Sequence, residues 1–506
     1  MSAPPLVVAS NRGPVTFSRM PHGGLSSRRG VGGLVTALAD AVQRRDVRWI
    51  AAPMTDGDRQ VLRSLDGQAP VADDLPLSRL RFVDVGWDEY RRYYREFSNR
   101  ILWFLHHGIE GSWSERFGGR EVNAWISYMD VNRRFAEAIA EEAKEGAPAF
   151  PQDYQLGLVP ANLRAIRPDV RIAQYWHIPF ATPQEYRQLP EPWGRQLLEG
   201  LLAADMIGFQ THRWASAFVA CCREFLGAAI VRAGGGWTVD HRGGRTTIGV
   251  YPIGVSPTSL EERAGRADVR REDADLAAWV DGRRLVLRVD RTDPSKNILR
   301  GLQAYELLLE RRPNLHRRIV HLAMLVPSRL DIPEYQAYLD ACLDRADRIN
   351  ERFGAGDWEP IRVELGENLA RAFAGYRRYD ALLVNPVRDG MNLVAREGPI
   401  LNRRGGALVL SATAGAAAEL GRAPLIIDPF DVERTAASLE HAIAMPSMER
   451  WRRARLLRRL ARGQTPKGWL QAQLRDLEST SRLEPSADPI DLVDLEPEDA
   501  TLATAT

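Results

Sequence analysis

Two cations follow an apolar run in the segment LRVDRTDPSKN, where Arg291 and Lys296 stand five residues apart. Pro294 lies in the turn between them, and a helical pattern begins just after it. Two cations beside the first turn of a helix form an anion site, suited to a diphosphate whose charge grows during a reaction. The alternative is a solvated pair of loop cations. Against it, 68 Lys and Arg residues include only three lysines, Lys144, Lys296 and Lys467, so a compact ammonium is kept here.

A second phosphate-binding pattern lies near the N-terminus. The first apolar run ends at Ser10, Arg12 follows it, and Gly30, Gly32 and Gly33 precede a helical pattern. Glycines at a helix N-terminus let backbone N–H groups approach a phosphate, whose charge the helix dipole favours. Glycines before a helix are as often plain turns, so neither interpretation prevails on this pattern alone.

Carboxylates and a histidine stand in the remaining loops. In NPVRDGMNLVAREG, Asp389 lies in a turn and Glu397 on the second turn of the helix that follows. Asp389 could cap that helix, or the two carboxylates could accept sugar or ribose hydroxyls. Asp153 and His177 each follow an apolar run and could hold a hydroxyl-rich ligand and stabilise positive charge at a sugar carbon. A histidine in this position is more often a structural hydrogen-bond donor.

Short apolar runs alternate with helical patterns along the chain, which predicts parallel sheets covered by helices on both faces. The expected strands cover residues 5–9, 48–52, 80–85, 170–176, 205–209, 284–290, 318–326, 379–384, 406–411 and 423–427. The expected helices cover residues 32–45, 123–144, 191–203, 211–226, 297–312, 334–352, 393–403 and 430–443. The predicted fold class is α/β, with doubly wound sheets.

The alternation breaks near residues 254–275, a polar stretch with glycine and proline and no apolar period. We expect two domains, residues 1–256 and 257–470, with a cleft where loops at the carboxyl ends of the strands meet. Residues 448–475 are arginine-rich with leucines at helical spacing, which favours a surface helix. Residues 483–506 carry seven acids and no base, and we expect them to be disordered.

Composition excludes several classes of protein. The chain of 506 residues is too long for one compact domain. It has neither a long apolar run nor a basic leader, so we expect no membrane span and no secretory signal, and a cytoplasmic location. Cys221, Cys222 and Cys342 fit no metal-ligand spacing.

Without the seven acids of residues 483–506, the net charge of +2 becomes about +9, with no basic stripe. This pattern disfavours nucleic acid and favours small anionic substrates.

From residue 5 to about 475, the chain resembles glycosyltransferase family 20, the trehalose-6-phosphate synthases. The motifs that carry the resemblance are Arg12, Gly32–Leu34, YYREFSNRILW, DYQL, HIPF, DMIGFQTHRWASAF, YPIG, RTDPSK, VPSR, RDGMNLVAREG and AGAAAEL. The resemblance implies a GT-B fold of two Rossmann-like domains, the acceptor domain first and the donor domain second. A final helix, about residues 467–478, would cross back to the first domain.

The same resemblance implies an enzyme that needs no metal or cofactor. It would transfer glucose, with retention, from a nucleoside diphosphate glucose (GDP-glucose or UDP-glucose) to glucose 6-phosphate, giving α,α-trehalose 6-phosphate. A donor phosphate oxygen could take the acceptor proton, so no protein nucleophile is needed.

On the donor side, the resemblance assigns roles residue by residue. Arg291, Lys296 and the backbone of Gly33 would hold the diphosphate, and Glu397 would take the ribose hydroxyls. The transferred glucose would be bound by a run of neighbours, Asp389, Gly390, Met391, Asn392 and Leu393. His177 would contact that sugar near its reacting carbon.

On the acceptor side, Asp153 would bind the acceptor hydroxyls, and Arg12, Tyr94, Trp103 and Arg329 would form the pocket for glucose 6-phosphate. The chemistry would therefore depend on Asp153, His177, Arg291, Lys296 and Asp389. No nucleic acid or membrane is expected as a partner, and a homo-oligomer, dimer or tetramer, stays open.

Departures from the family pattern leave alternatives. Gln155 stands where the family usually has histidine, Phe104 where proline is common, and Thr292, Pro294 and Asn297 alter the cationic loop. This loop is similar to that of an actinobacterial branch with pseudoglycosyltransferases that use GDP-activated donors. One alternative is thus an enzyme that couples a GDP-cyclitol to a phosphorylated aminocyclitol, and another is a catalytically silent regulatory homologue. The complete RDGMNLVAREG run favours a true sugar, and the intact cationic loop favours activity.

Overall fold

The computed structural model describes residues 5–20, 24–29, 38, 42, 46–64, 68–69, 79–111, 117–233 and 235–480. Gly30, Gly32 and Gly33, most of the predicted helix over residues 32–45, and the acidic segment 483–506 lie outside the described residues. The described chain forms two compact units. The first holds the residues up to His106, Glu110–Tyr251 and those from Lys467 onward, and the second holds His107–Ile109 and Pro252–Pro466.

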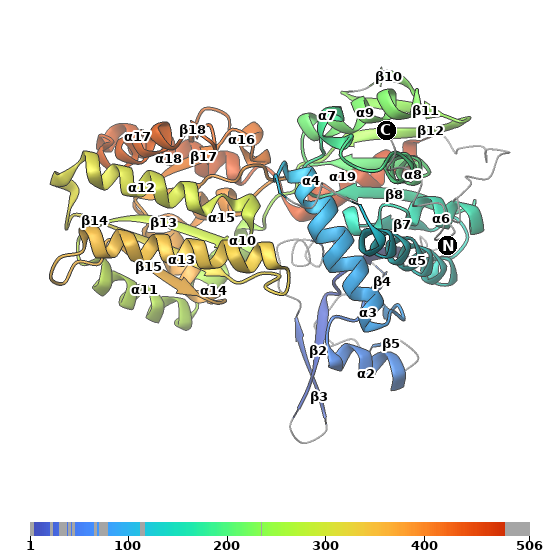
Figure 1. Cartoon of the computed structure of the whole chain (residues 1–506), viewed down its shortest axis with the longest axis horizontal. Coiled ribbons are helices and arrows are strands. Elements are labelled where there is room, and N and C mark those ends of the chain that lie inside the picture. The colour runs from blue at the N-terminus through green and yellow to red at the C-terminus, as the bar shows by residue number, and fades with distance from the viewer. Residues whose placement is uncertain are drawn as a thin grey trace. The chain divides into compact units, whose positions relative to one another are not determined.

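A mainly parallel sheet forms the centre of the first unit (Figure 1). Its strands are β1 (Leu6–Ser10), β4 (Val47–Ala51), β5 (Gln68–Ala69), β6 (Arg79–Phe82), β7 (Pro148–Pro151), β8 (Arg171–Trp176), β9 (Met206–Phe209), β10 (Ala229–Ala233), β11 (Gly236–His241) and β12 (Gly244–Val250). They lie in the order β10-β11-β12-β9-β8-β7-β1-β4-β6-β5. The run β6-β4-β1-β7-β8-β9 is parallel throughout and has the strand order of a Rossmann fold. A separate hairpin joins β2 (Val15–Arg19) and β3 (Leu25–Arg29).

The helices of the first unit are α2 (Asp56–Ser64), α3 (Trp87–Tyr90), α4 (Trp103–His107), α5 (Gly119–Glu142), α6 (Val159–Ile166), α7 (Pro183–Tyr186), α8 (Glu191–Leu202) and α9 (His212–Leu226). A π-helical segment, Arg91–Leu102, joins α3 to α4. The final helix, α19 (Pro466–Ser479), also packs on this unit, because the indole of Trp469 lies against the rings of Phe150 and Tyr175.

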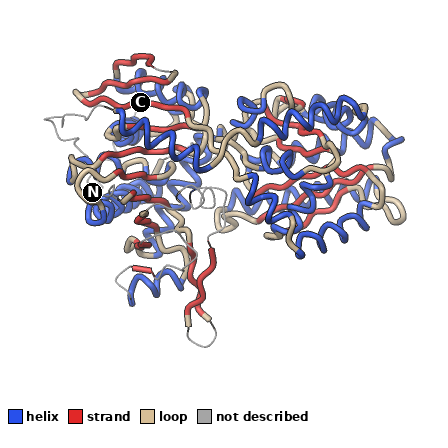
Figure 2. Tube along the Cα trace, turned by 180° about the vertical axis from the view of Figure 1, so that it is seen from behind, coloured by secondary structure: helices blue, strands red, loops and turns tan. Residues whose placement is uncertain are grey.

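The second unit has an all-parallel sheet. Its strands are β13 (Arg284–Arg291), β14 (Ile319–Val326), β15 (Ile361–Leu365), β16 (Ala381–Val384), β17 (Ala407–Ser411) and β18 (Leu425–Ile427). Their order, β15-β14-β13-β16-β17-β18, is again that of a Rossmann fold. Its helices are α10 (Pro257–Ala264), α11 (Ala267–Val280), α12 (Ile298–Arg311), α13 (Pro333–Phe353), α14 (Leu369–Arg378), α15 (Val394–Leu401), α16 (Gly415–Leu420), α17 (Val432–Ala444) and α18 (Ser447–Ala461). Figure 2 shows the strands of each unit between helices.

The predicted α/β class with two Rossmann-like sheets is confirmed. The prediction of an irregular break over residues 254–275 is wrong, because these residues form most of α10 and α11. Their apolar stripe is too narrow to show a period: α11 buries only Val269, Leu276 and Val280. Residues 448–475 are likewise not a single surface helix, since α19 buries Trp469 and Leu470. No helix in the described part of the chain is long and apolar enough to cross a membrane.

Candidate functional site

In the second unit, the strand order reverses between β13 and β16. In open parallel sheets, the ligand crevice lies outside the carboxyl ends of the strands at such a switch point. Arg291 ends β13, Lys296 lies in the following turn, and Asp389 lies in the loop after β16. The structure brings the last two together, because the Lys296 ammonium forms an ion pair with the Asp389 carboxylate. The two loops singled out by sequence therefore meet at the switch point of the sheet.

Hydrogen bonds fix the loop after β13. A 3₁₀ turn over Pro294–Lys296 begins at Asp293, whose carboxylate accepts the Ser295 N–H at 3.0 Å. Asn297 follows with φ 57°, a left-handed conformation that glycine or asparagine adopts most readily. Its Nδ2 donates to the carbonyl oxygen of Asn385 at 3.0 Å. Asn297 thus keeps the left-handed turn and adds a link to the loop after β16.

A buried arginine in β13 is hydrogen-bonded to both loops. Arg288, in the middle of β13, is fully buried, and its guanidinium donates to Asp290 Oδ2 at 2.7 Å and to the carbonyl of Lys296 at 3.3 Å. It also donates to Asn385 Oδ1 in the loop after β16. Gly301 in α12 makes room for this group, since a Cβ there would lie 2.4 Å from Arg288 Nη2. Arg288 therefore ties the strand, the cationic turn and the neighbouring loop together.

Burial and cations act in opposite senses on the carboxyls at this edge. Burial raises the pKa of Asp290 to about 6, although Arg288 and Lys296 work against it. For Asp389, burial also raises the pKa, but the Lys296 ammonium outweighs it and leaves the pKa below its usual value. Burial raises the pKa of Glu397, which the hydrogen bond with Tyr376 only partly offsets. Asp389 is the carboxylate that stays firmly ionised.

The loop of Asp389 packs closely on the first turn of α16. The N–H of Gly415 donates to the Asp389 carbonyl at 3.1 Å, and a Cβ on Gly415 would lie 1.9 Å from the Gly390 carbonyl oxygen. Asn392, with φ 73°, donates to Asp389 Oδ2 at 3.0 Å. Its own side-chain oxygen accepts from the backbone of α15, so the capping role considered for Asp389 belongs to Asn392. Met391 and Leu393 flank it, the first buried and the second half-buried.

Arg329 lies in the second unit, in the loop after β14, with φ 52°. Its guanidinium forms an ion pair with Asp293 at 2.9 Å and a hydrogen bond with the Tyr335 hydroxyl at 2.9 Å. Burial raises the pKa of Asp293, but Arg329 and Arg291 outweigh it and lower the pKa to about 2. Arg329 is thus joined to the cationic turn, while the other predicted acceptor residues lie in the first unit.

The first unit repeats the switch-point arrangement between β1 and β7. Arg12 follows β1, and Asp153 follows β7 with φ 73°. His177 follows the next strand, β8, and its N–H donates to Asp153 Oδ1 at 3.1 Å. The structure therefore places the predicted pair, Asp153 and His177, in direct contact at the carboxyl edge of the sheet.

Two glutamines hold the His177 ring. Gln152 donates through its amide nitrogen to backbone carbonyls, so its Oε1 accepts from His177 Nε2 at 2.9 Å. Gln210 Nε2 lies 3.4 Å from His177 Nδ1, where it can donate. The ring also packs beside the indole of Trp469 in α19. Burial lowers the pKa of His177 to about 3, so this ring is neutral at physiological pH.

Aromatic rings connect the other acceptor candidates in the first unit. Tyr94 stacks on Tyr90 with centroids 5.2 Å apart, and Tyr90 is close enough to Arg12 for the guanidinium to influence its pKa. Trp103 lies 5.7 Å from the ring of Tyr154, the residue after Asp153. Tyr94, Trp103 and Arg12 are thereby linked to one edge of the sheet.

Several residues of these sites gave no signal in the sequence. Arg288 and Asp290 sit inside a strand, where a charged side chain normally indicates an exposed face. Gln152 and Gln210 contact His177 from two different loops, which no local pattern could pair. His107, near enough to Asp389 to lower its pKa, comes from a segment far away in the chain.

The neutral ring of His177 predicts a pH effect on stability. Below about pH 6.5 the unfolded chain protonates this histidine, while the folded protein keeps it neutral to about pH 3. Protons then favour unfolding, so the free energy of unfolding should fall as the pH drops from 7 to 5. We expect His177→Asn to reduce that fall by about 1–2 kcal/mol, measured by urea denaturation at both pH values. Parallel losses in the two proteins would contradict the buried neutral ring.

Comparisons with known proteins agree with this geometry. The model of glycosyltransferase family 20 matches residues 4–479. A trehalose-6-phosphate synthase from Mycolicibacterium smegmatis is 35% identical over 488 residues, which cover 94% of this chain and 92% of that protein.

Two solved structures are similar over most of their length. The UDP-forming α,α-trehalose-phosphate synthase from Burkholderia xenovorans, in complex with glucose-6-phosphate, has a TM-score of 0.82 at 28% identity, covering 94% of this chain and 100% of that one. A structure from E. coli bound with UDP-2-fluoro glucose has a TM-score of 0.80 at 28% identity, covering 94% and 99%. Their fold is the GT-B fold that the motifs implied. Motifs, sheet topology and the match over almost the whole sequence together show that this chain belongs to glycosyltransferase family 20.

Proposed function

We propose that the protein is an α,α-trehalose-6-phosphate synthase. It transfers glucose from a nucleoside diphosphate glucose to glucose 6-phosphate, with retention at the donor carbon. The observation that carries the proposal is the Lys296–Asp389 ion pair at the switch point of the second sheet. It joins the cation of a diphosphate clamp to the carboxylate of a sugar site within one crevice. The substrates named for the Burkholderia and E. coli structures point to the same two ligands.

The donor is assigned to the second unit. Arg291 and Lys296 hold the diphosphate. A lysine has three donors, so Lys296 can keep its bond to Asp389 and still donate twice to phosphate oxygens. Glu397, with Tyr376 beside it, takes the ribose hydroxyls. The loop of Asp389 and Gly390, which α16 fixes, carries the glucose.

The acceptor is assigned to the edge where Arg12, Asp153 and His177 lie. Arg12 supplies the charge for a phosphate, and Tyr94 and Trp103 supply ring faces beside it. Asp153 accepts hydrogen bonds from the hydroxyls of the acceptor. The neutral His177 suits a hydrogen-bonding role near the sugar rather than a cationic one, because burial keeps its pKa low.

The bond between the glucose anomeric carbon and the diphosphate oxygen breaks, and the leaving charge grows beside Arg291 and Lys296. The acceptor hydroxyl attacks the same face, and its proton passes to an oxygen of the leaving phosphate. The fixed cations stabilise the transition state, and no protein nucleophile takes part.

A donor panel tests the proposal. The full chain is incubated with glucose 6-phosphate and GDP-, UDP- or ADP-glucose, and the product is identified by NMR. We expect α,α-linked trehalose 6-phosphate from at least one donor, and the panel also identifies the preferred base. Absence of product with every donor would overturn the assignment.

The chain offers a matched pair of lysines. We expect Lys296→Ala to lower kcat by roughly 30- to 1000-fold, corresponding to about 2–4 kcal/mol, because one charge-stabilising donor is lost. Lys144→Ala, an exposed lysine in the first unit, is the control and should retain full turnover. A Lys296→Ala enzyme with near-normal kcat would show that the cationic turn has another role.

A substitution at Gly301 tests whether Arg288 positions the two loops of the donor site. Alanine there would push Arg288 away from Asn385 and loosen both loops, so we expect the donor KM to rise about tenfold. Gly119→Ala, at the start of α5, meets no atom within 4 Å and is the matched control. Steady-state kinetics of both variants decide the point. An unchanged donor KM in Gly301→Ala would mean that Arg288 does not position the loops.

A further inference from the structure

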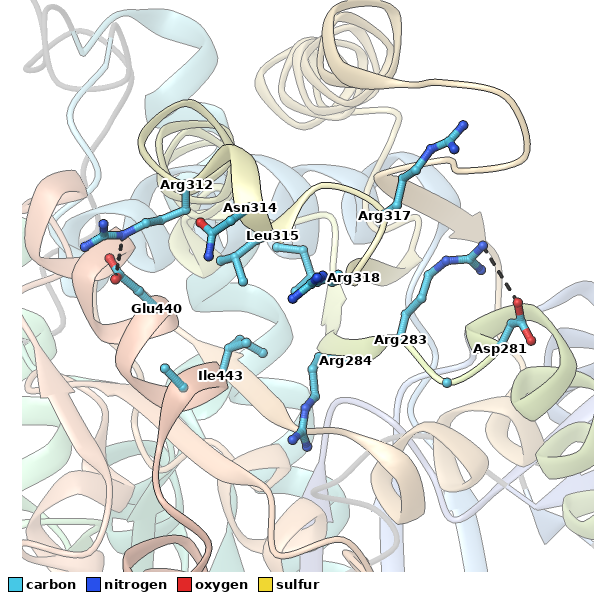
Figure 3. A pocket seen from close by; sticks show the side chains of 13 residues that line it. Asp281, Arg283, Arg284, Arg312, Asn314, Leu315, Arg317, Arg318, Glu440 and Ile443 are labelled. Atoms are coloured by element: carbon cyan, nitrogen blue, oxygen red, sulfur yellow. Dashed lines mark ion pairs between the residues drawn. The ribbon is translucent and has the colours of Figure 1, made fainter.

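A cavity of about 730 Å³ lies at the amino-terminal edge of the second unit's sheet (Figure 3). Three segments line it: the turn before β13, the connection between α12 and β14, and the last turns of α17. β13 runs from this edge at Arg284 to the proposed donor loop at Arg291. Its eight residues span roughly 23 Å at about 3.3 Å per step. A ligand in the cavity therefore cannot touch the reacting atoms.

The lining is strongly cationic. Five arginines face two carboxylates, and the arginines are Arg283, Arg284, Arg312, Arg317 and Arg318. The volume falls in the range of small-molecule pockets. Leu315, Ile443 and Ala444 add apolar surface, and Asn314 adds an amide. The cavity thus offers cations for an anionic group and mixed surface for the rest of a small molecule.

Ion pairs occupy three of these arginines, Arg283, Arg284 and Arg312. Arg312 Nε pairs with Glu440 Oε1 at 2.6 Å. Arg284 pairs with the buried Asp380 at 2.7 Å and so links the beginnings of β13 and β16. Asp380 also pairs with Arg404 at 3.8 Å and Arg450 at 3.7 Å, so it compensates the Arg284 charge only in part. Arg283 pairs with Asp281 at 3.9 Å, which Figure 3 marks with a dashed line, and with the exposed Asp357 at 3.3 Å.

The other two arginines have no ion pair with any residue that the structure describes. Within that part of the chain, Arg317 donates to the neutral carbonyl of Ala355 at 3.0 Å. The Arg318 side chain has no hydrogen bond or ion pair with any residue that the structure describes, and Figure 3 shows it between Leu315 and Arg284.

The backbone of Arg318 is nevertheless fixed. Its N–H donates to the Leu315 carbonyl at 2.9 Å, and its carbonyl accepts the Arg284 N–H at 2.8 Å. The unpaired guanidinium therefore extends from an anchored position at the sheet edge. A planar guanidinium matches phosphate oxygens in a bidentate manner, and neighbouring cations strengthen such a bond.

We propose that this cavity binds a phosphorylated small molecule, with its phosphate group at Arg318. The bound molecule is an effector and not a substrate, since it lies at the opposite edge of the sheet from the proposed donor loop. The assignment of the bound molecule as an effector rests on the proposed function, whereas phosphate binding at Arg318 does not.

Isothermal titration of the full chain tests the site, with glucose 6-phosphate and inorganic phosphate as separate probes. We compare the wild type with Arg318→Gln, which removes an exposed, unpaired side chain and should leave the fold intact. The control is Arg348→Gln, an exposed arginine on α13 outside the cavity. Any binding in the catalytic crevice is common to all three proteins, so differences between them report the cavity.

We expect one binding event whose Kd rises at least tenfold in Arg318→Gln and stays unchanged in Arg348→Gln. Arg318→Lys, which keeps the charge but loses the fork, should lie between these limits. Tighter binding of the ester identifies an organic phosphate, and equal binding identifies free phosphate as the natural source. Identical titrations of the wild type and Arg318→Gln, or an equal loss in Arg348→Gln, would overturn the proposal.

Discussion

The buried guanidinium of Arg288 is the contact on which the second unit's site depends. It bonds to Asp290, to the backbone of Lys296 and to Asn385, and so joins the ends of two neighbouring strands whose loops would otherwise diverge. Removing a partner from a buried charge costs far more than an exposed ion pair contributes. The network therefore keeps Lys296 beside Asp389, and the geometry proposed for donor binding follows from that constraint.

The two units use the same topology for different electrostatics. At the switch point of the second sheet, cations and ionised carboxylates lie side by side, as an anionic leaving group requires. At the corresponding edge of the first sheet, His177 is neutral and engaged by two glutamines, and the rings of Tyr94 and Trp103 lie nearby. The edge in the second unit is thus dominated by charged side chains, and the edge in the first unit by neutral hydrogen-bonding groups and aromatic rings.

Loop position was the most predictable feature. Parallel strands bring their carboxyl ends to one edge, so a charged loop after each strand, such as those of Lys296 and Asp389, could be assigned to a shared site without coordinates. The support beneath that site was not predictable. Arg288 lies within an apolar strand run, and its partners come from loops far apart in the chain. The π-helical segment Arg91–Leu102 was not predicted either, because a π-helix does not have the 3.6-residue period by which an α-helix is identified.

The proposed donor site is tested most directly by a crystal structure of the full chain with a bound nucleoside diphosphate. We predict that the diphosphate lies at the carboxyl ends of β13 and β16, against Arg291 and Lys296, with Lys296 still beside Asp389. A diphosphate bound elsewhere, with this crevice empty, would contradict it.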